Sequence, residues 1–453
     1  MHAKRSLSDC AKQLVLKLFD DYSSHISAEI LLHAEKWRFT HGYSDKPFLL
    51  SGLHCASFFG IVEIVAFLLE VEGCDINQTD CTGSTPLVWA ASNGHEEVVK
   101  ILLGRDDANP EKSNKYGETP LRCAAWNGRG EVVKMLLGRG HVNPDTPDRS
   151  GRTPLWCAAL NGHEEVVKIL LETGDLNPDK RDIYGQTPFW GAAKNGHDGV
   201  VKILLGRADV NCDKPNMHGE TPLWWAALNG HEAVVKMLLR RDSTDPNKAD
   251  RYGRTPLWGA AENGHQAVVK ILLRRDDVDS NEPNKDGETP LWCAAKNGHE
   301  EVVKILLGRD DVNPNKASGS GETPLWCAAG NGHEEVVKIL LERDHINPNK
   351  NDNGGRTPLW CAAKNGHEGV VKMLLRRDDI NPDKPNNEGI TPLLCAAVGG
   401  HEGVVGVLLG RDDVNPDKPD SGGRTPLWWA VLRGHERVVE LLQPIASAAL
   451  SAA

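Results

Sequence analysis

Cysteine and histidine recur in this chain at a fixed spacing, and such pairs are candidate metal ligands. A Cys-x5-His pair occurs at Cys157 and His163 and again at Cys293 and His299. A zinc site needs two close pairs that converge on one tetrahedron, whereas each pair here recurs without a partner pair. We therefore expect no metal, and we interpret the histidines as structural hydrogen-bonding groups, with pH sensing as the alternative.

Acidic pairs and glycine motifs offer no catalytic centre either. Asp-Asp pairs such as Asp106-Asp107 and Asp310-Asp311 occupy one recurring loop, and we expect them to be solvated turn formers. The sequence has no Gly-Lys dipeptide for a phosphate-binding loop, no Gly-x-Ser-x-Gly nucleophile turn and no second His for a metalloprotease helix. We expect a protein that is not an enzyme and that uses no cofactor and no small-molecule substrate.

Tryptophan is the residue whose placement is most open to a binding role. It recurs at one repeat position, at Trp156, Trp190, Trp224, Trp258, Trp292, Trp326, Trp360 and Trp428, and Arg122 stands at the same position. A ladder of rings could stack bases, but binding of single-stranded nucleic acid also needs a basic groove, and this chain has a net charge of −11 without a basic block. We therefore expect the indoles to pack beneath neighbouring hairpins and to donate their N–H groups to backbone carbonyls, at a site that Arg122 keeps from being fully dry.

These positions belong to a repeat of 34 residues that covers most of the chain. The triplet Thr-Pro-Leu (Thr-Pro-Phe in one repeat) begins at Thr85, Thr119, Thr153, Thr187, Thr221, Thr255, Thr289, Thr323, Thr357, Thr391 and Thr425, and a weaker copy begins at Ser51. Self-similarity at such a period is typical of a solenoid, in which each unit buries its apolar face only by stacking on its neighbours.

Each repeat carries the signals of two helices. Thr153 can cap the first helix, and Pro154 suits its first position. Asn161-Gly162 can adopt the left-handed conformation that ends this helix. Residues 166–171, with the sequence Val-Val-Lys-Ile-Leu-Leu, supply the apolar face of the second helix.

The order of these motifs resembles the ankyrin repeat. Thr-Pro-Leu, Ala-Ala, Asn-Gly-His, Val-Val, Leu-Leu and Asp-Val-Asn follow one another as in that family, over roughly nine-tenths of the chain. The resemblance implies an all-α ankyrin-repeat solenoid of about twelve helix-turn-helix units with projecting β-hairpin loops. The Asn-Pro-Asp-Lys-Pro-Asp style of loop further resembles fungal arrays that follow NACHT-type modules. That likeness predicts an alternative role as the sensor or regulatory portion of a signalling NTPase that lacks its nucleotide-binding module.

We expect three segments along the chain: an N-terminal helical capping segment or linker at 1–45, the array at 46–443 and a C-terminal tail at 444–453. Arg437 and Glu440 predict that the last repeat presents a polar end. The sequence has neither a signal-peptide core nor an apolar run of membrane-spanning length. Cysteine exchanges with Gly or Trp at its repeat position, which favours packing over disulfide pairing. We expect a cytoplasmic protein without a membrane or nucleic-acid partner.

The repeats differ mainly at three positions, just before Gly, just before Thr and just after Ala-Ala, and the resemblance implies that these positions line a concave groove. Drift at exposed sites is the alternative interpretation. Because Trp, Tyr and Arg dominate interface hot spots, we predict a protein partner in the groove. The predicted contact residues are Tyr116, Glu118, Trp126, Arg152, Leu160, Tyr184, Gln186, Lys194, Leu228, Tyr252, Arg254 and Glu262. We expect the strongest contacts around Tyr116, Trp126, Leu160 and Tyr184, with Glu118 and Arg152 at the rim.

Overall fold

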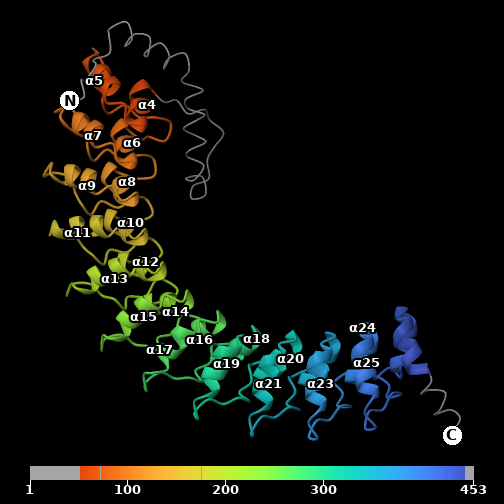
Figure 1. Cartoon of the computed structure of the whole chain (residues 1–453). Coiled ribbons are helices and arrows are strands. Elements are labelled where there is room, and N and C mark those ends of the chain that lie inside the picture. The colour runs from red at the N-terminus through yellow and green to blue at the C-terminus, as the bar shows by residue number, and fades with distance from the viewer. Residues whose placement is uncertain (1–50, 72, 175, 444–453) are drawn as a thin grey trace, which may run out of the picture. The chain divides into compact units, whose positions relative to one another are not determined.

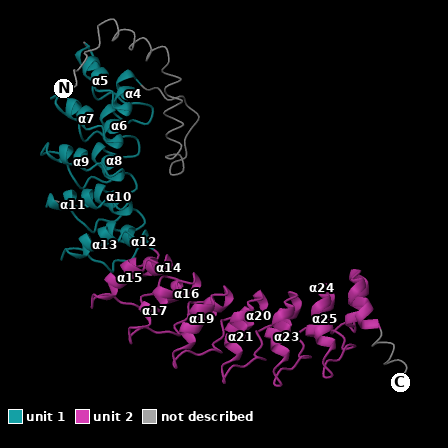
Figure 2. Cartoon of the chain, viewed as in Figure 1, with its two compact units in different colours: residues 1–217 teal, residues 218–453 magenta. Residues whose placement is uncertain are grey.

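The computed structural model of the chain describes residues 51–71, 73–174 and 176–443. The predicted N-terminal segment 1–45 and C-terminal tail 444–453 lie outside the described residues. Helices are the only regular secondary structure in the described part. The chain divides into two compact units, residues 1–217 and residues 218–453, which are built from the same kind of repeat (Figure 2).

The described residues of the first unit form five helix pairs. Its first helices are α4 (Gly52–Phe59), α6 (Pro86–Asn93), α8 (Pro120–Trp126), α10 (Pro154–Leu160) and α12 (Pro188–Lys194). Its second helices are α5 (Val62–Glu70), α7 (Glu96–Leu103), α9 (Gly130–Leu137), α11 (Glu164–Glu172) and α13 (Asp198–Leu205). Successive first helices pack on one another, and so do successive second helices, so the unit consists of two parallel rows (Figure 1).

The second unit continues the pattern with seven pairs. Its first helices are α14 (Pro222–Leu228), α16 (Pro256–Glu262), α18 (Pro290–Lys296), α20 (Pro324–Asn331), α22 (Pro358–Lys364), α24 (Pro392–Gly399) and α26 (Pro426–Arg433). Its second helices are α15 (Glu232–Leu239), α17 (Gln266–Leu272), α19 (Glu300–Leu307), α21 (Glu334–Leu341), α23 (Glu368–Leu375), α25 (Glu402–Leu409) and the helical residues 436–443. Within residues 51–71, 73–174 and 176–443 the five and seven pairs make the twelve that the period predicted, and the solenoid is confirmed.

Local sequence signals set the ends of the first helices. Thr153 Oγ1 accepts a hydrogen bond from the Trp156 N–H at 3.1 Å, and Pro154 follows Thr153 at the first helical position. This bond satisfies one of the N–H groups that every helix start leaves free. Gly162 then turns the chain with φ of 77°, and a Cβ atom there would lie 2.6 Å from Nδ1 of His197. Glycine is therefore required for both the conformation and the close approach of the next repeat.

A histidine precedes most of the second helices, and it ties its repeat to the preceding one. His163 Nε2 donates to the Trp126 carbonyl at 2.9 Å, and His299 Nε2 donates to the Glu262 carbonyl at 2.9 Å. A carbonyl only accepts, so Nε2 carries the proton. Burial lowers the pKa of His163, which favours the neutral form. The predicted structural role is confirmed, but the bond crosses between repeats instead of closing the turn within one.

Short turns connect the repeats at one edge of each unit. Asp148 Oδ1 accepts from the N–H groups of Ser150 and Arg152 at 2.8 and 2.9 Å, which folds the loop into a tight turn. The Arg149 N–H donates to the Tyr116 carbonyl of the preceding turn at 2.9 Å. One backbone bond of this kind joins successive turns, which is too few for a ladder. The loops predicted as β-hairpins are therefore hairpin-like turns without strands in the described residues.

The prediction of a polar end for the last repeat is wrong. Val431 replaces an Ala that is fully buried in the inner repeats, and Val431 is 59% exposed. Trp428 and Leu432 on the same helix, α26, are also exposed. Arg437 and Glu440 lie on the second helix of this repeat, where they pair at 3.0 Å, whereas the open apolar surface belongs to the first helix.

Candidate partner-binding surface

The predicted contact residues occupy three columns, a column being the equivalent position in successive repeats. Before Gly, Tyr184 and Tyr252 are exposed and Tyr116 is half-buried. After Ala-Ala, all five predicted side chains are half-buried at the ends of first helices: Trp126, Leu160, Lys194, Leu228 and Glu262. Before Thr, Arg152, Gln186 and Arg254 are half-buried and Glu118 is buried. Leu228, Tyr252, Arg254 and Glu262 belong to the second unit, and the other predicted residues belong to the first.

Glu118 lies in the interior and not at the rim of a binding site. Glu118 and Arg122 are each 2% exposed, and Arg122 Nη1 donates to Glu118 Oε1 at 2.7 Å. Arg122 Nη2 donates to Asp148 Oδ2 at 3.0 Å, so two carboxylates face one guanidinium. A buried cation persists when it is paired and hydrogen-bonded in this way. The expectation that Arg122 keeps its site wet is therefore wrong, because carboxylates take the place of water.

Five tryptophans of the column, all in the second unit, have the packing role that the sequence predicted, whereas Trp156 Nε1 is buried without a hydrogen-bond partner and Trp428 is exposed. Trp258 Nε1 donates to the Glu288 carbonyl at 3.1 Å, and Trp292 Nε1 donates to the Glu322 carbonyl at 3.0 Å, in each case in the turn of the next repeat. The same bond recurs at Trp224, Trp326 and Trp360. These indoles are mostly buried, so in the second unit they are structural groups and not a ladder for stacking bases.

The column before Thr varies because its side chain pairs within its own turn. In four repeats an Asp four positions earlier pairs with Arg in this column, as in Arg152 with Asp148 at 2.9 Å and Arg254 with Asp250 at 2.6 Å. Ser84 and Gln186 also follow an Asp and do not fit this pairing. In three repeats the earlier residue is Asn and the column holds Glu, as in Asn284, whose Nδ2 donates to Glu288 at 2.8 Å, whereas Ile390 follows Asn386. Most of the variation in this column, which suggested partner contacts, therefore reflects pairing within a turn. The residue four positions earlier is the sequence feature that could have predicted it.

Among the described residues of the first unit, the most exposed apolar side chains lie on its last turns, and the sequence analysis missed two of them. Ile183 and Tyr184 are each 55% exposed, and Met217 is 65% exposed. The Met217 N–H donates to the Tyr184 carbonyl at 3.0 Å, which holds the two turns side by side. We call Ile183, Tyr184 and Met217 the hairpin-tip patch. The sequence feature that could have revealed this patch is the column two residues before Gly. Ile183 and Met217 stand there, whereas other repeats hold Lys or Arg, at Lys115, Arg149, Arg251 and Lys285.

Trp126 is held more closely than the sequence implied. The Arg122 guanidinium lies 5.3 Å from the centroid of the Trp126 ring, within the range of a cation–π interaction. The backbone carbonyl of Trp126 accepts the bond from His163. Trp126 therefore has structural neighbours, and Tyr184, which is exposed, is the cleaner probe of binding.

In the second unit, the predicted contact residue Arg254 lies against two aromatic rings. The Arg254 guanidinium lies 5.0 Å from the Trp224 ring and 5.1 Å from the Tyr252 ring. Loss of hydration on burial raises the pKa of Glu262, and the nearby Glu288 adds to the rise. This surface combines a stacked Arg254 with a carboxyl group, that of Glu262, whose raised pKa disfavours ionisation.

The described residues show no grouping of three or more His, Cys, Asp or Glu side chains placed to hold a metal ion. The cysteine column is buried and its described thiols are free. Burial raises the pKa of Cys157 to about 11 and that of Cys361 to about 12, which disfavours the thiolate that metals and electrophiles need. No helix in residues 51–71, 73–174 or 176–443 is both long and apolar enough to cross a bilayer.

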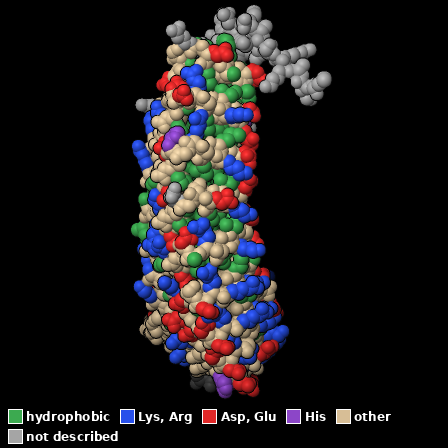
Figure 3. All heavy atoms as spheres, turned by 90° about the vertical axis from the view of Figure 1, so that its left-hand side faces the viewer, with side chains coloured by type: hydrophobic (Ala, Val, Ile, Leu, Met, Phe, Trp, Pro, Cys, Tyr) green, Lys and Arg blue, Asp and Glu red, His purple; other side chains and the backbone are tan. Residues whose placement is uncertain are grey.

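Charges of both signs are interspersed over the face shown in Figure 3, and neither sign forms a continuous block there. Acidic side chains lie at helix N-termini, as with Glu164 and Glu165 in the first turn of α11, because the positive end of the helix dipole favours carboxylates there. This face therefore offers no basic groove of the kind that tracks a phosphate backbone.

Comparison with known families identifies the repeats. A family model described as ankyrin repeats (3 copies) matches residues 53–148, 139–214, 176–250, 192–282, 223–318, 309–386 and 377–449. Because these matches run through nearly the whole described chain, the chain belongs to the ankyrin repeat family. Ankyrin repeats serve in general as protein–protein interaction modules, without catalysis. A comparison with curated proteins gave no match.

Proposed function

We propose that this protein is a non-enzymatic scaffold that binds a protein partner along the surface formed by its first helices and turns. The hairpin-tip patch of the first unit is the observation that carries the proposal. Single exposed apolar residues are common on protein surfaces, whereas three that adjoin one another mark an interaction site. Arg152 and Gln186, half-buried in the column before Thr, supply the polar border that such sites have.

The predicted contacts at Leu160 and Lys194 support the same region. Both side chains are half-buried at the ends of α10 and α12, on the row of first helices that carries the turns of the patch. Partly exposed aliphatic stems can still contribute apolar area to a partner while Lys194 keeps its charge in water.

The test begins with affinity capture of a partner by the intact chain, followed by calorimetric titration. Tyr184→Ala should weaken binding by about 2 kcal/mol or more, the hot-spot threshold, with little change in melting temperature because Tyr184 is exposed. Phe59→Ala, which removes another exposed aromatic ring of the first unit outside the predicted contact residues, is the control and should leave the affinity nearly unchanged. Equal losses for the two variants, or a loss that follows the melting temperature, would reject the hairpin-tip patch as the binding centre.

The identity of the captured protein tests the alternative role. A partner that carries a nucleotide-binding module would favour a regulatory function within a signalling NTPase, as the likeness to NACHT-associated arrays predicts. A partner without such a module would favour a general scaffold.

A further inference from the structure

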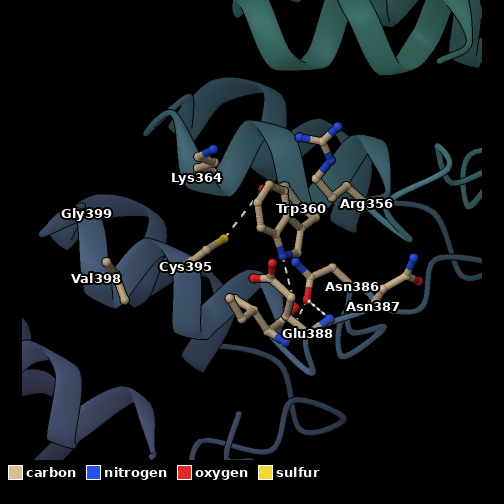
Figure 4. Close-up of a pocket in the computed structure, with 11 residues that line it drawn as sticks. Arg356, Trp360, Lys364, Asn386, Asn387, Glu388, Cys395, Val398 and Gly399 are labelled. Carbon is tan, nitrogen blue, oxygen red and sulfur yellow. Dashed lines mark hydrogen bonds between the residues drawn. The ribbon is translucent and has the colours of Figure 1, made fainter. Parts of the chain in front are cut away.

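The second unit contains a pocket of about 650 Å³ between two successive repeats (Figure 4). One side is formed by Trp360 and Lys364 of α22, and another by Cys395 and Val398 of α24. The remaining lining residues are Gly354, Arg356, Asn386, Asn387, Glu388, Ile390 and Gly399. All three variable columns are represented, so the pocket lies on the surface where a partner was predicted.

The pocket exists because one repeat lacks the large polar side chains that its neighbours carry. Ile390 fills the column before Thr, where Arg or Glu is usual, and Val398 fills the column after Ala-Ala, where Lys194, Lys296 and Lys364 stand in other repeats. Gly399 replaces the Asn found at this column in most repeats. These changes fall within ten residues of one another and all reduce or remove a polar side chain, so the wall they leave is apolar.

Two charges of opposite sign remain without ion-pair partners at this pocket. Lys364 Nζ lies 5.4 Å from the Trp360 ring centroid, and no described carboxylate lies within ion-pair distance of it. Glu388 is exposed and likewise has no cationic partner among the described residues. The two side chains lie on different sides of Trp360 (Figure 4). Arg356, in contrast, is already held by Asp352.

The Cys395 thiol is part of the wall and not a reactive group. Its Sγ donates to the Pro392 carbonyl at 3.1 Å and lies 3.5 Å from the Trp360 carbonyl. Burial raises the pKa of Cys395 above its ordinary value. The pocket therefore offers recognition by shape and charge, without a nucleophile.

We propose that this pocket anchors one apolar side chain of an extended segment of a protein partner, with an acidic residue of the segment facing Lys364 and a basic residue facing Glu388. The proposal rests on the proposed scaffold function and adds a second anchor with a stated partner chemistry. In an extended chain, side chains alternate between faces, so residues two apart point the same way. The expected motif is therefore an apolar residue with opposite charges two positions before and two positions after it.

The test is a selection from a phage-displayed library of random peptides on the full chain. Peptides that also bind a variant with a filled pocket, Ile390→Glu with Val398→Lys, are removed during the selection. Both new residues occur naturally at these columns, and Asn386 stands where Asn284 donates to Glu288, so the variant should fold normally. Peptides specific for the wild type should carry the motif, and a synthetic copy should bind the filled variant at least about tenfold more weakly by fluorescence polarisation.

Charge variants then test the orientation. Lys364→Gln should weaken the selected peptide several-fold, yet have no effect on a peptide whose acidic residue is changed to Gln. Lys296→Gln is the matched control, because Lys296 lies over Trp292 at 4.7 Å in the same column but does not line the pocket. It should not change binding.

Two outcomes would overturn the proposal in different ways. Selected peptides that bind the filled variant equally well, or that lack the opposite charges, would reject the pocket as an anchor and leave the scaffold function standing. A selection that enriches no peptide at all would reject the pocket and would also count against a partner recognised through a linear segment, which is one form of the scaffold function.

Discussion

Arg122 in the first unit and the tryptophans of the second unit occupy the same column and are stabilised by different chemistry. Trp292 is an apolar ring with one N–H group, and a single backbone carbonyl satisfies it. Arg122 carries a charge, and two carboxylates, Glu118 and Asp148, surround it. The column thus accepts an apolar ring or a charged side chain, and it does not require an aromatic ring.

This difference means that substitutions at the column are coupled to residues elsewhere. A tryptophan of the second unit donates to a backbone carbonyl of the next turn, and five repeats supply this carbonyl. An arginine depends on Glu118 in its own repeat and Asp148 in the next, so these three residues form one set. A change in one member of the set should therefore cost more than a change in the tryptophan N–H.

The largest effect is expected from Arg122→Met. This substitution keeps much of the volume but leaves the buried Glu118 carboxylate without its cation, and breaking a buried pair in this way costs about 3–5 kcal/mol. Because repeats contact only their neighbours, hydrogen exchange should accelerate mainly in α6, α8 and α10. Urea unfolding followed by circular dichroism measures the loss, with Arg149→Met at an exposed position as the control. Equal midpoints for the two variants would contradict the coupling.

The comparison can be sharpened by converting one chemistry into the other. Asn114→Asp, Glu118→Arg and Arg122→Trp together reproduce the set found at Asp148, Arg152 and Trp156. The triple variant should recover most of the urea midpoint lost in Arg122→Met. A triple variant less stable than Arg122→Met would show that the site depends on more than the matching of these three residues.

A smaller effect is expected from Trp292→Phe. Phenylalanine keeps part of the aromatic ring but lacks the indole N–H. The Glu322 carbonyl, which accepts from that N–H, retains its bond from the Ser318 N–H at 2.9 Å. The loss should therefore be about 1–2 kcal/mol, against about 3–5 kcal/mol for Trp292→Ala, which also opens a cavity. The same urea experiment compares the two variants. A Phe variant as unstable as the Ala variant would mean that the hydrogen bond, and not packing, governs this column.

The smallest effect concerns pH in the second unit. Burial raises the pKa of Glu322, with a further rise from the nearby Asp352. The folded chain then binds this proton more tightly than the unfolded chain, so the free energy of unfolding falls as the pH rises from the ordinary carboxyl pKa through the raised one. Glu322→Gln removes this loss and should be more stable than the wild type at neutral pH, with the gain vanishing below about pH 4. Thermal melts across this range test it, and a gain that persists in acid would contradict the assignment.

The features that the sequence predicted correctly are those that depend on neighbouring residues. Thr153, Pro154 and Gly162 set helix ends through bonds and dihedral angles within one repeat, so their roles follow from residue type and order. The tryptophan N–H bonds were also predictable, because the next repeat has the same sequence pattern and supplies a carbonyl at the same place.

The exposed and charged sites were harder to predict, since each depends on what packs over it. Glu118 and Glu388 are both acidic residues of variable columns, yet one is sealed against Arg122 and the other is open at a pocket. Ile183 and Met217 belong to a column that was not singled out, and their importance comes from the approach of two successive turns.

The sequence alone determined the period, the helix pairs, the caps and the membership of a repeat family, because these arise from short-range patterns that recur twelve times. Only the tertiary structure decided which polar residues are buried, where the apolar patch lies and which repeat opens into a pocket. The physical reason is that burial is a property of contacts between neighbouring repeats, and a single side chain such as Arg122, Ile390 or Val431 changes those contacts without changing the pattern.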